Sequence, residues 1–441
     1  MHMTNKDPKK TYCANAWKHQ HIHQSGSFRM CCITKDNILN DKGHRFNINQ
    51  DSLERAHHSN HMKEVRRKMM NGEPLKECTR CYEHEERGFK SFRDQENMEE
   101  HFKLTKPDGS TESMPTSMEL HYGNTCNLKC KMCGQNYSNQ IGKELLEIGK
   151  SDKDFLSWVY QQSGNVNIWT NNLSVEYTWF KNVKTKNKLM KYVSDHIERL
   201  TIIGGEPTII PEFYELLDYC SKQNTLKDKS IVLTTNLTNV NPKMTDWLPK
   251  LKGWTVFASI DGLNERTEYI RFPSNFNKVV ENLNFYKNLA NEHGNGHIIF
   301  SPAIQLLNID QLDDMLKWFI DFADGDFIGD NGNDLFGISW LCQVWYPTIC
   351  NYDIAPTDYK RSVADKLSRS VDNFKNYKGI IKFYENQIEN LRADPMPADQ
   401  KNNHQSSFIR YNDTQDKHRG KTTWRQLLPD LAKAIDKNLK Q

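Results

Sequence analysis

No stretch of the sequence approaches the roughly 20 consecutive apolar residues that a membrane-spanning helix needs. The first residues, MHMTNKDPKKTYCANAW, show no apolar run after their basic residues, so they lack the pattern of a signal peptide. Neither sign of charge dominates, because 59 Lys and Arg stand against 56 Asp and Glu, and this balance does not by itself indicate a nucleic-acid partner. We therefore expect a cytoplasmic protein without a membrane partner, in a compartment that keeps thiols reduced.

Cysteine is also scarce, with 11 in 441 residues, but 8 of the 11 precede residue 134. In a reducing compartment, clustered cysteines indicate metal binding or catalysis rather than disulfides. The tightest group lies in CNLKCKMC, where Cys126, Cys130 and Cys133 have the spacing C-x3-C-x2-C. Three thiolates make a poor structural zinc site, because such a site takes four protein ligands. They can hold a 4Fe–4S cluster and leave one iron free to bind another molecule.

A Pro/Thr/Ser-rich stretch, TKPDGSTESMPT at residues 105–116, predicts a linker. It separates a Cys-rich N-terminal module at 1–104 from a main domain at 117–350, and a helical extension is expected at 351–441. From HIERLTII onward, predicted strands and helices alternate, which indicates βα units on a parallel sheet. Residues 150–185 are rich in Asn and aromatic side chains and have no clear period, so we expect an insertion or lid there.

Three local patterns lead to further expectations. Residues 52–71 have the pattern of one helix, with Ser52 as its N-cap, and residues 392–420 that of a polar loop. His19, His21 and His23 alternate, so on a strand they would share one face. That face could bind a metal, but a solvated or pocket-lining face is the simpler interpretation.

Polar motifs stand at the ends of four successive predicted strands, in the order IIGGEP, LTTNLT, ASIDG and PAIQLLNIDQL. Together with the preceding three cysteines, this ordered set resembles the radical S-adenosylmethionine (SAM) superfamily. The resemblance implies an α/β fold, a partial (β/α)6 TIM-like barrel with its site at the carboxyl ends of the strands. It also implies that Cys126, Cys130 and Cys133 hold a 4Fe–4S cluster whose free iron binds SAM. Reductive cleavage of SAM then yields a 5′-deoxyadenosyl radical that abstracts hydrogen from a substrate.

The resemblance further implies which residues bind SAM. Many members have an aromatic residue before the third cysteine; here Met132 could fill that space with a polarizable sulfur. The implied SAM-binding residues are Met132, Gly204, Gly205, Glu206, Pro207, Thr235, Asn236, Ser259, Asp261, Arg271, Gln305 and Asn308.

The N-terminal cysteines resemble the auxiliary-cluster (SPASM) module in its short twitch form, with Cys13-x12-Gly26-x4-Cys31 followed by Cys78-x2-Cys81. The module here precedes the barrel, as in a group of bacterial and phage-encoded twitch proteins. The resemblance implies a second 4Fe–4S cluster at Cys13, Cys31, Cys78 and Cys81, with Cys32 as the alternative to Cys31. Two distant cysteine pairs can equally make a structural zinc site, which stays open.

Twitch and SPASM relatives favour peptide or protein substrates, and this is the expected function. The alternatives are the same chemistry on a small molecule, nucleoside or RNA, and a non-catalytic binding protein stabilised by zinc or a cluster. An external electron is needed, which implies a flavodoxin- or ferredoxin-type donor. Cys342 is a candidate hydrogen-atom donor and Cys350 a second, although an oxidation that used the auxiliary cluster would need no such thiol.

Overall fold

The computed structural model describes residues 7–34, 36–86, 91–162, 172–324, 336–338 and 343–440. The chain folds into two compact units. Unit 1 consists of Met1–Gly123, Tyr177–Leu233 and Lys250–Gly253, and unit 2 of Asn124–Glu176, Thr234–Pro249 and Trp254–Gln441. The linker expected at 105–116 lies inside unit 1, and the boundaries between the predicted domains stay a prediction. Within the described ranges, no helix is long and apolar enough to cross a membrane.

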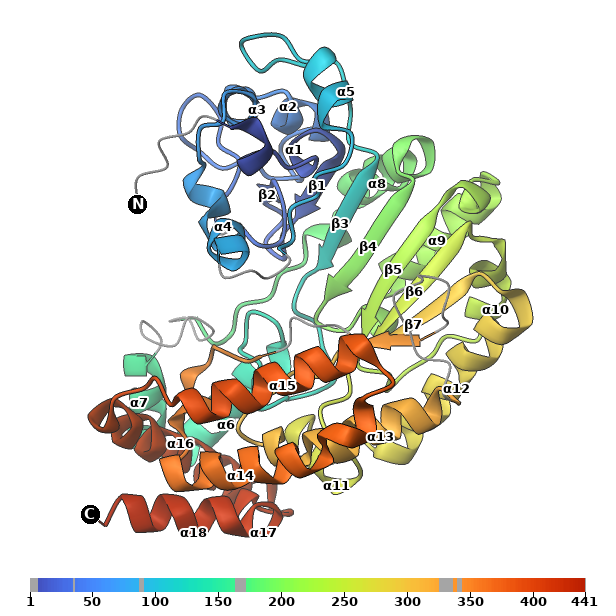
Figure 1. The fold of residues 1–441 in the computed structure, drawn as a ribbon. Helices are drawn as coiled ribbons and strands as arrows, with labels where there is room; N and C mark the ends of the chain where they lie inside the picture. Colours follow the sequence, from blue (N-terminus) through green and yellow to red (C-terminus); the bar gives the residue numbers. More distant parts are fainter. Residues whose placement is uncertain are drawn as a thin grey trace. The chain divides into compact units, whose positions relative to one another are not determined.

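Unit 1 is built on a mostly parallel sheet with the strand order β2-β1-β3-β4-β5 (Figure 1). Only β2 runs antiparallel to its neighbour β1. The strands are β1 (His19–Ile22), β2 (Phe28–Arg29), β3 (Ser117–Tyr122), β4 (Arg199–Gly204) and β5 (Ser230–Thr235), which continues into unit 2. Tyr122 packs against Phe213 and stacks on Trp179, so one face of β3 is an aromatic core. Helices α8 (Val183–His196) and α9 (Pro211–Lys222) lie along the sheet.

The N-terminal part of unit 1 is made of short helices. They are α1 (Asn15–Lys18), α2 (Leu53–His57), α3 (Asn60–Met70), α4 (Thr79–Glu86) and α5 (Met98–Lys103), with a 3-10 helix η2 at Lys76–Cys78. The expectation of one helix over 52–71 is wrong. Ser52 caps α2 as predicted, but the hydroxyl of Ser59 accepts a hydrogen bond from the amide of Met62 and begins a second helix, α3.

Unit 2 holds the parallel strands β6 (Gly253–Ala258), β7 (Gly296–Phe300) and β8 (Phe336–Ile338), paired in that order. The α-helices of unit 2 that precede the C-terminal extension are α6 (Asn139–Ser151), α7 (Lys153–Gln162), α10 (Met244–Trp247), α11 (Glu265–Ile270), α12 (Phe276–His293) and α13 (Leu312–Phe322). The alternation of strands and helices confirms the α/β class and the parallel strands. Closure into a partial barrel stays an expectation.

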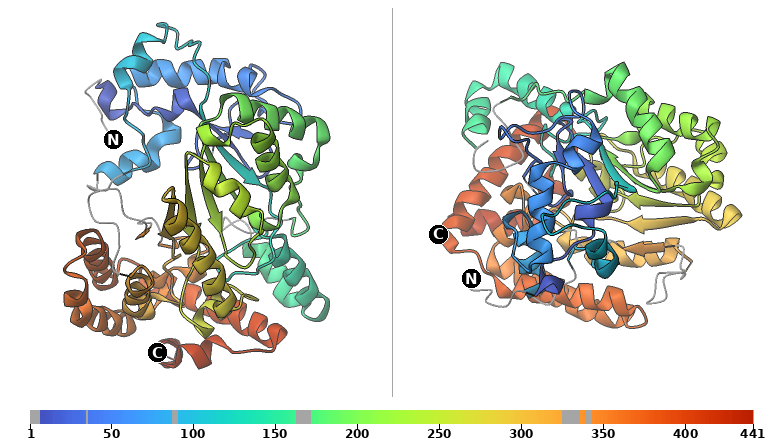
Figure 2. Two further views of the ribbon diagram at one scale, coloured as in Figure 1. Left: turned by 90° about the vertical axis from the view of Figure 1, so that its right-hand side faces the viewer. Right: turned by 90° about the horizontal axis from the view of Figure 1, so that it is seen from above.

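Five helices end the chain and confirm the helical C-terminal extension (Figure 2). They are α14 (Thr357–Ser370), α15 (Lys378–Ala393), α16 (Ala398–Arg419), α17 (Trp424–Leu427) and α18 (Pro429–Asn438). The polar loop expected at 392–420 is wrong, because most of it forms α16. The buried stripe of α16 consists mainly of polar side chains spaced by three or four residues: Gln405, Phe408, Tyr411, Asn412 and Gln415. A stripe of this kind gives no apolar period from which a helix can be predicted.

Candidate functional site

The cysteine loop, residues 126–133, connects β3 to α6 in unit 2. Its backbone pairs with the segment after α11: the Lys129 amide donates to the Phe272 carbonyl at 2.5 Å and the Lys131 amide to the Ile270 carbonyl at 2.8 Å. The Ser138 hydroxyl donates to the Leu128 carbonyl at 2.6 Å. These bonds fix the loop from outside, so its conformation does not depend on the thiols alone.

The three thiols of this loop interact with one another. Cys126 and Cys130 are buried and Cys133 packs against them, beside the half-buried Met132. A hydrogen bond from Cys133 lowers the pKa of Cys130, and the nearby Arg271 guanidinium lowers it further against the effect of burial. Hydrogen bonding to Cys130, burial and the charge of Cys126 raise the pKa of Cys133. Three interacting thiols on one short loop are a donor set that fits a 4Fe–4S cluster in which the fourth iron has no cysteine ligand.

Four of the predicted SAM-binding residues form one buried network in unit 2. Asp261 is paired with Arg271, Nε to Oδ2 at 2.7 Å, and accepts from the Ala303 amide at 2.7 Å. Asn308 donates to the Asp261 carbonyl at 2.8 Å, and its side-chain oxygen accepts from the Gln305 amide at 2.7 Å. The Gln305 Oε1 atom is fully buried and has no hydrogen-bond partner among the described residues. It is therefore a buried acceptor suited to a bound polar ligand.

Two further predicted residues stand where β5 ends. The Thr235 hydroxyl accepts from the Leu237 amide at 3.1 Å, and the Thr235 carbonyl accepts from the amide of the half-buried Ser259 at 3.1 Å. Asn236 donates to Asn127 Oδ1 at 3.0 Å, and Asn127 donates in turn to the Thr238 hydroxyl at 2.7 Å. Sequence reasoning missed Asn127 and Thr238. They link the cysteine loop directly to the end of β5.

The GGEP motif belongs to unit 1, at the end of β4. A Cβ at Gly204 (φ +153°) would lie 3.0 to 3.2 Å from the Tyr122 backbone, so the glycine is required by the close approach of β3. Glu206 is buried, and its Oε1 accepts from the amide and hydroxyl of Thr208 at 3.0 and 2.7 Å. Part of its carboxylate thus caps the turn that Pro207 begins. Gly205 is half-buried beside it.

The N-terminal cysteines gather in unit 1. Burial raises the pKa of Cys13 to about 12, and Cys31 and Cys81 contribute to the increase. Burial, and then the charges of Cys13, Cys31 and Cys81, raise the pKa of Cys78. The charges of these four thiols therefore affect one another. Cys32 is exposed, and its thiol forms a hydrogen bond with Glu119. Among the described residues, no three His, Cys, Asp or Glu side chains form a group that could hold a single metal ion.

His19 and His21 alternate along β1 and His23 directly follows it; His21 is buried, and His19 and His23 are half-buried. His21 Nδ1 lies 3.2 Å from Glu119 Oε1 on β3. The rings of His21, His23 and His121 have centroids 6.0 to 6.3 Å apart. Burial lowers the pKa of His23 to about 2 and that of His121 to about 3, so both are neutral at pH 7.

Of the two candidate hydrogen-atom donors, the structure describes Cys350. Cys342 lies outside the described residues. Cys350 is buried, its thiol donates to the Lys131 carbonyl at 3.5 Å, and burial raises its pKa to about 12. Cys350 therefore lies against the cysteine loop and is a buried thiol that stays protonated.

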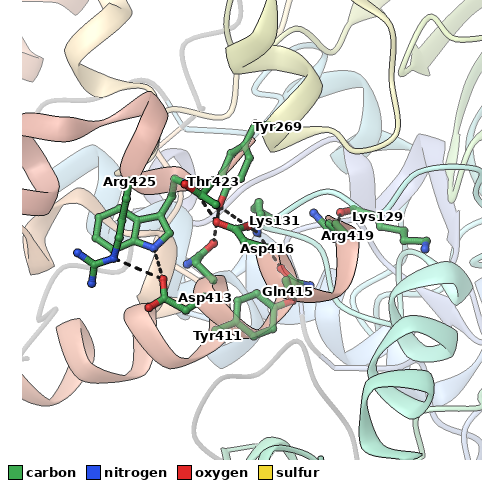
Figure 3. A network of polar contacts seen from close by, with 12 residues as sticks. Lys129, Lys131, Tyr269, Tyr411, Asp413, Gln415, Asp416, Arg419, Thr423 and Arg425 are labelled. Carbon is green, nitrogen blue, oxygen red and sulfur yellow. Dashed lines mark hydrogen bonds and ion pairs between the residues drawn. The ribbon is translucent and has the colours of Figure 1, made fainter. Parts of the chain in front are cut away.

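Helix α16 carries the residues that sequence reasoning missed most completely (Figure 3). Lys131, between two cysteines of the loop, donates from Nζ to Gln415 and Asp416, both at 3.1 Å. Arg419 donates to the Lys129 carbonyl at 2.9 Å and pairs with Glu144 of α6 at 2.8 and 3.0 Å. The three- and four-residue spacing of positions 408, 411, 412, 415 and 419 was the available signal, but all of these positions except Phe408 carry a polar group.

Residues 120–319 match the radical SAM superfamily, and residues 13–82 match an iron-sulfur cluster-binding domain known as SPASM. The chain is 29% identical over 130 residues to mycofactocin maturase MftC of Mycolicibacterium smegmatis. The aligned segment covers 28% of this chain and 31% of that protein. The chain is 30% identical over 130 residues to MftC of Mycobacterium tuberculosis strain H37Rv, with the same shares. The match thus spans about a third of the curated relatives.

Two solved structures are similar at low scores. SuiB of Streptococcus suis bound to S-adenosylmethionine has a TM-score of 0.35 and 14% identity, over 81% of this chain and 69% of that chain. The anSMEcpe structure with bound AdoMet has a TM-score of 0.36 and 17% identity, over 60% and 62%. At these scores the likeness carries no argument. The sequence matches show a radical SAM region at residues 120–319 and a SPASM iron–sulfur region at residues 13–82, and they support an enzyme of the radical SAM type.

Proposed function

We propose that Cys126, Cys130 and Cys133 hold the catalytic 4Fe–4S cluster and that the enzyme acts on a peptide or protein. The observation that carries the first part is the set of three interacting thiols on one loop, held from outside by backbone bonds to residues 270–272. When bound, the cluster and SAM supply a 5′-deoxyadenosyl radical that abstracts hydrogen. The protein supplies binding, orientation and charge.

The residues around this loop would orient SAM. Gln305 offers a buried acceptor oxygen, and Asn236, joined to Asn127, offers polar groups at the end of β5. Arg271 is paired with Asp261, Nε to Oδ2 at 2.7 Å, and it stays in the proposed SAM-binding set. Met132, Thr235, Ser259 and Asn308 stay in the proposed SAM-binding set of unit 2, and the GGEP residues of unit 1 stay predicted SAM-binding residues.

For the auxiliary cluster we propose Cys13, Cys31, Cys78 and Cys81 as ligands. Their mutual effects on pKa support this set, and the contact between Cys32 and Glu119 supports Cys31 over Cys32. The electron for SAM cleavage would come from a flavodoxin- or ferredoxin-type donor, because the cluster must be reduced before SAM is cleaved.

The peptide or protein substrate is supported by the match to the mycofactocin maturases, which covers 28% of the chain. The same chemistry on a small molecule is the competing proposal. Trp158 and Trp179 do not favour either, because Trp158 is buried against Arg410 and Trp179 against Tyr122.

The test uses the identity of the hydrogen donor. The reconstituted enzyme is incubated with SAM, dithionite and a deuterated cell extract that has been separated by size, and the 5′-deoxyadenosine is analysed by mass spectrometry. We expect 5′-deoxyadenosine to gain deuterium from the peptide and protein fraction. After protease treatment of that fraction, no deuterium should be transferred. Deuterium gained only from the small-molecule fraction would overturn the peptide proposal and leave the radical chemistry intact.

A further inference from the structure

The C-terminal helix α16 lies outside the radical SAM match at 120–319, yet it makes direct contact with the cysteine loop. Arg419, the last residue of α16, donates from Nη2 to the Lys129 carbonyl at 2.9 Å. Its guanidinium also lies over the Phe272 ring, 4.6 Å from the centroid. Because the Lys129 amide bonds to the Phe272 carbonyl, Arg419 contacts both sides of the backbone pairing that shapes the loop.

Arg419 is itself held by a buried carboxylate. Its Nε and Nη2 atoms donate to the two oxygens of Glu144 at 3.0 and 2.8 Å, the forked geometry that lysine cannot reproduce. The side chain of Arg419 is 4% exposed and that of Glu144 is 0% exposed. A buried charge is costly unless it is paired, so this pair fixes one arrangement of α6, α16 and the loop.

A second contact from α16 reaches the loop one turn earlier (Figure 3). Asp416 accepts from Lys131 Nζ at 3.1 Å and from the Tyr269 hydroxyl at 2.9 Å. The Lys131 ammonium also lies 4.5 Å from the centroid of the Tyr269 ring. Since Tyr269 is on α11, just before the segment that pairs with the loop, Asp416 ties the loop, α11 and α16 together.

We infer that α16 is a positioning element for the cluster loop, and that Arg419 both holds the loop and contributes positive charge to the cluster. Lys129, whose carbonyl accepts from Arg419 at 2.9 Å, directly precedes Cys130, so the guanidinium charge lies close to a ligand of the cluster. Groups that orient metal ligands typically change metal affinity or activity by roughly 10- to 100-fold when they are removed. The inference rests on the proposed role of the three cysteines.

The chain provides a matched control on the same helix. Arg410 also donates to a backbone carbonyl, that of Asp154 at 3.0 Å, and also lies over an aromatic ring, that of Trp158 at 5.2 Å. It does not contact the cysteine loop in any interaction of the described residues. Arg419→Gln and Arg410→Gln therefore make the same chemical change, with and without the contact to the loop.

The experiment compares the full-length reconstituted holoenzymes. The readouts are the rate of iron loss to a chelator and the midpoint potential of the EPR signal that changes on addition of SAM. We expect Arg419→Gln to lose this cluster about 10-fold faster or more and to shift its potential downward, because a positive charge is removed. Arg410→Gln should match the wild type in both readouts.

Equal behaviour of the two variants would overturn the inference. If Arg419→Gln does not fold, Arg419→Lys replaces it: this variant keeps the charge but loses the fork, so faster iron loss at an almost unchanged potential is expected. Iron loss from Arg419→Lys at the rate of Arg410→Gln would also overturn the inference. A wild-type protein without any SAM-responsive cluster would instead contradict the proposed function, so the two failures are distinguishable.

Discussion

Replacement of Glu144 by Gln should destabilise the protein strongly, although the two side chains have nearly the same size. In the wild type the Glu144 carboxylate accepts two bonds from Arg419 and one from Gln415 at 3.1 Å, and Lys129 Nζ lies 3.4 Å away. The substitution leaves the Arg419 guanidinium buried without its counter-charge and turns one oxygen into a donor that faces Gln415.

The magnitude follows from the burial of this pair. Loss of one partner of a buried ion pair costs about 3–5 kcal/mol. We take the lower end, about 3 kcal/mol, because the remaining amide oxygen and the Lys129 carbonyl still accept from Arg419. For a domain of 150–250 residues, each kcal/mol lowers the melting temperature by roughly 2–4 °C, which gives a decrease of about 6–12 °C.

The assay is thermal unfolding of the cluster-free protein, followed by circular dichroism at neutral pH. The control is Glu147→Gln, one turn along α6, which breaks an exposed pair with Lys150 whose side chains are 56% and 72% exposed. We expect the control to melt with the wild type, because exposed pairs contribute little. Equal melting temperatures for Glu144→Gln and Glu147→Gln would refute the reasoning.

The remaining predictions concern pH and the auxiliary thiols. Burial raises the pKa of Glu144, but Arg419 holds it below the ordinary value of 4.5. The ionised carboxylate therefore stabilises the folded protein above that pH, and this stabilisation is lost as the pH falls. The difference in melting temperature between the wild type and Glu144→Gln should therefore be constant above pH 4.5 and become smaller below it. A difference that became larger as the pH falls would contradict this. Cys78→Ala with Cys81→Ala should remove about four irons per chain and keep the SAM-responsive EPR signal, whereas unchanged iron with one zinc lost would identify a zinc site. Cys31→Ser should give the same loss and Cys32→Ser none, by iron analysis; the reverse pattern would exchange the two ligands.

The cysteine loop and the strand-end residues could be predicted because their signals are local. The spacing of Cys126, Cys130 and Cys133 is complete within eight residues, and alternating strands place Asp261 and Asn308 at neighbouring strand ends. The residues that contact and hold the cysteine loop could not be predicted from the sequence in this way. Arg419 and Glu144 are 275 residues apart, and no local pattern says that one neutralises the other.

The errors in the fold have physical causes as well. Helix α16 was missed because buried polar side chains such as Gln415 and Asn412 replace the apolar residues that mark a buried face. Residues 52–71 form two helices because Ser59 offers a second N-cap, which competes with continuation of the first helix. In both places hydrogen bonds rather than hydrophobic periodicity decide the local structure.

The most direct test of the account is anaerobic reconstitution followed by iron and sulfide analysis, and then by an assay of 5′-deoxyadenosine after addition of dithionite and SAM. The wild type should bind about eight irons per chain and form 5′-deoxyadenosine, and Cys130→Ala should form none. A wild-type protein that binds no iron, or a Cys130→Ala variant that forms as much 5′-deoxyadenosine as the wild type, would contradict the assignment of the catalytic cluster to the cysteine loop.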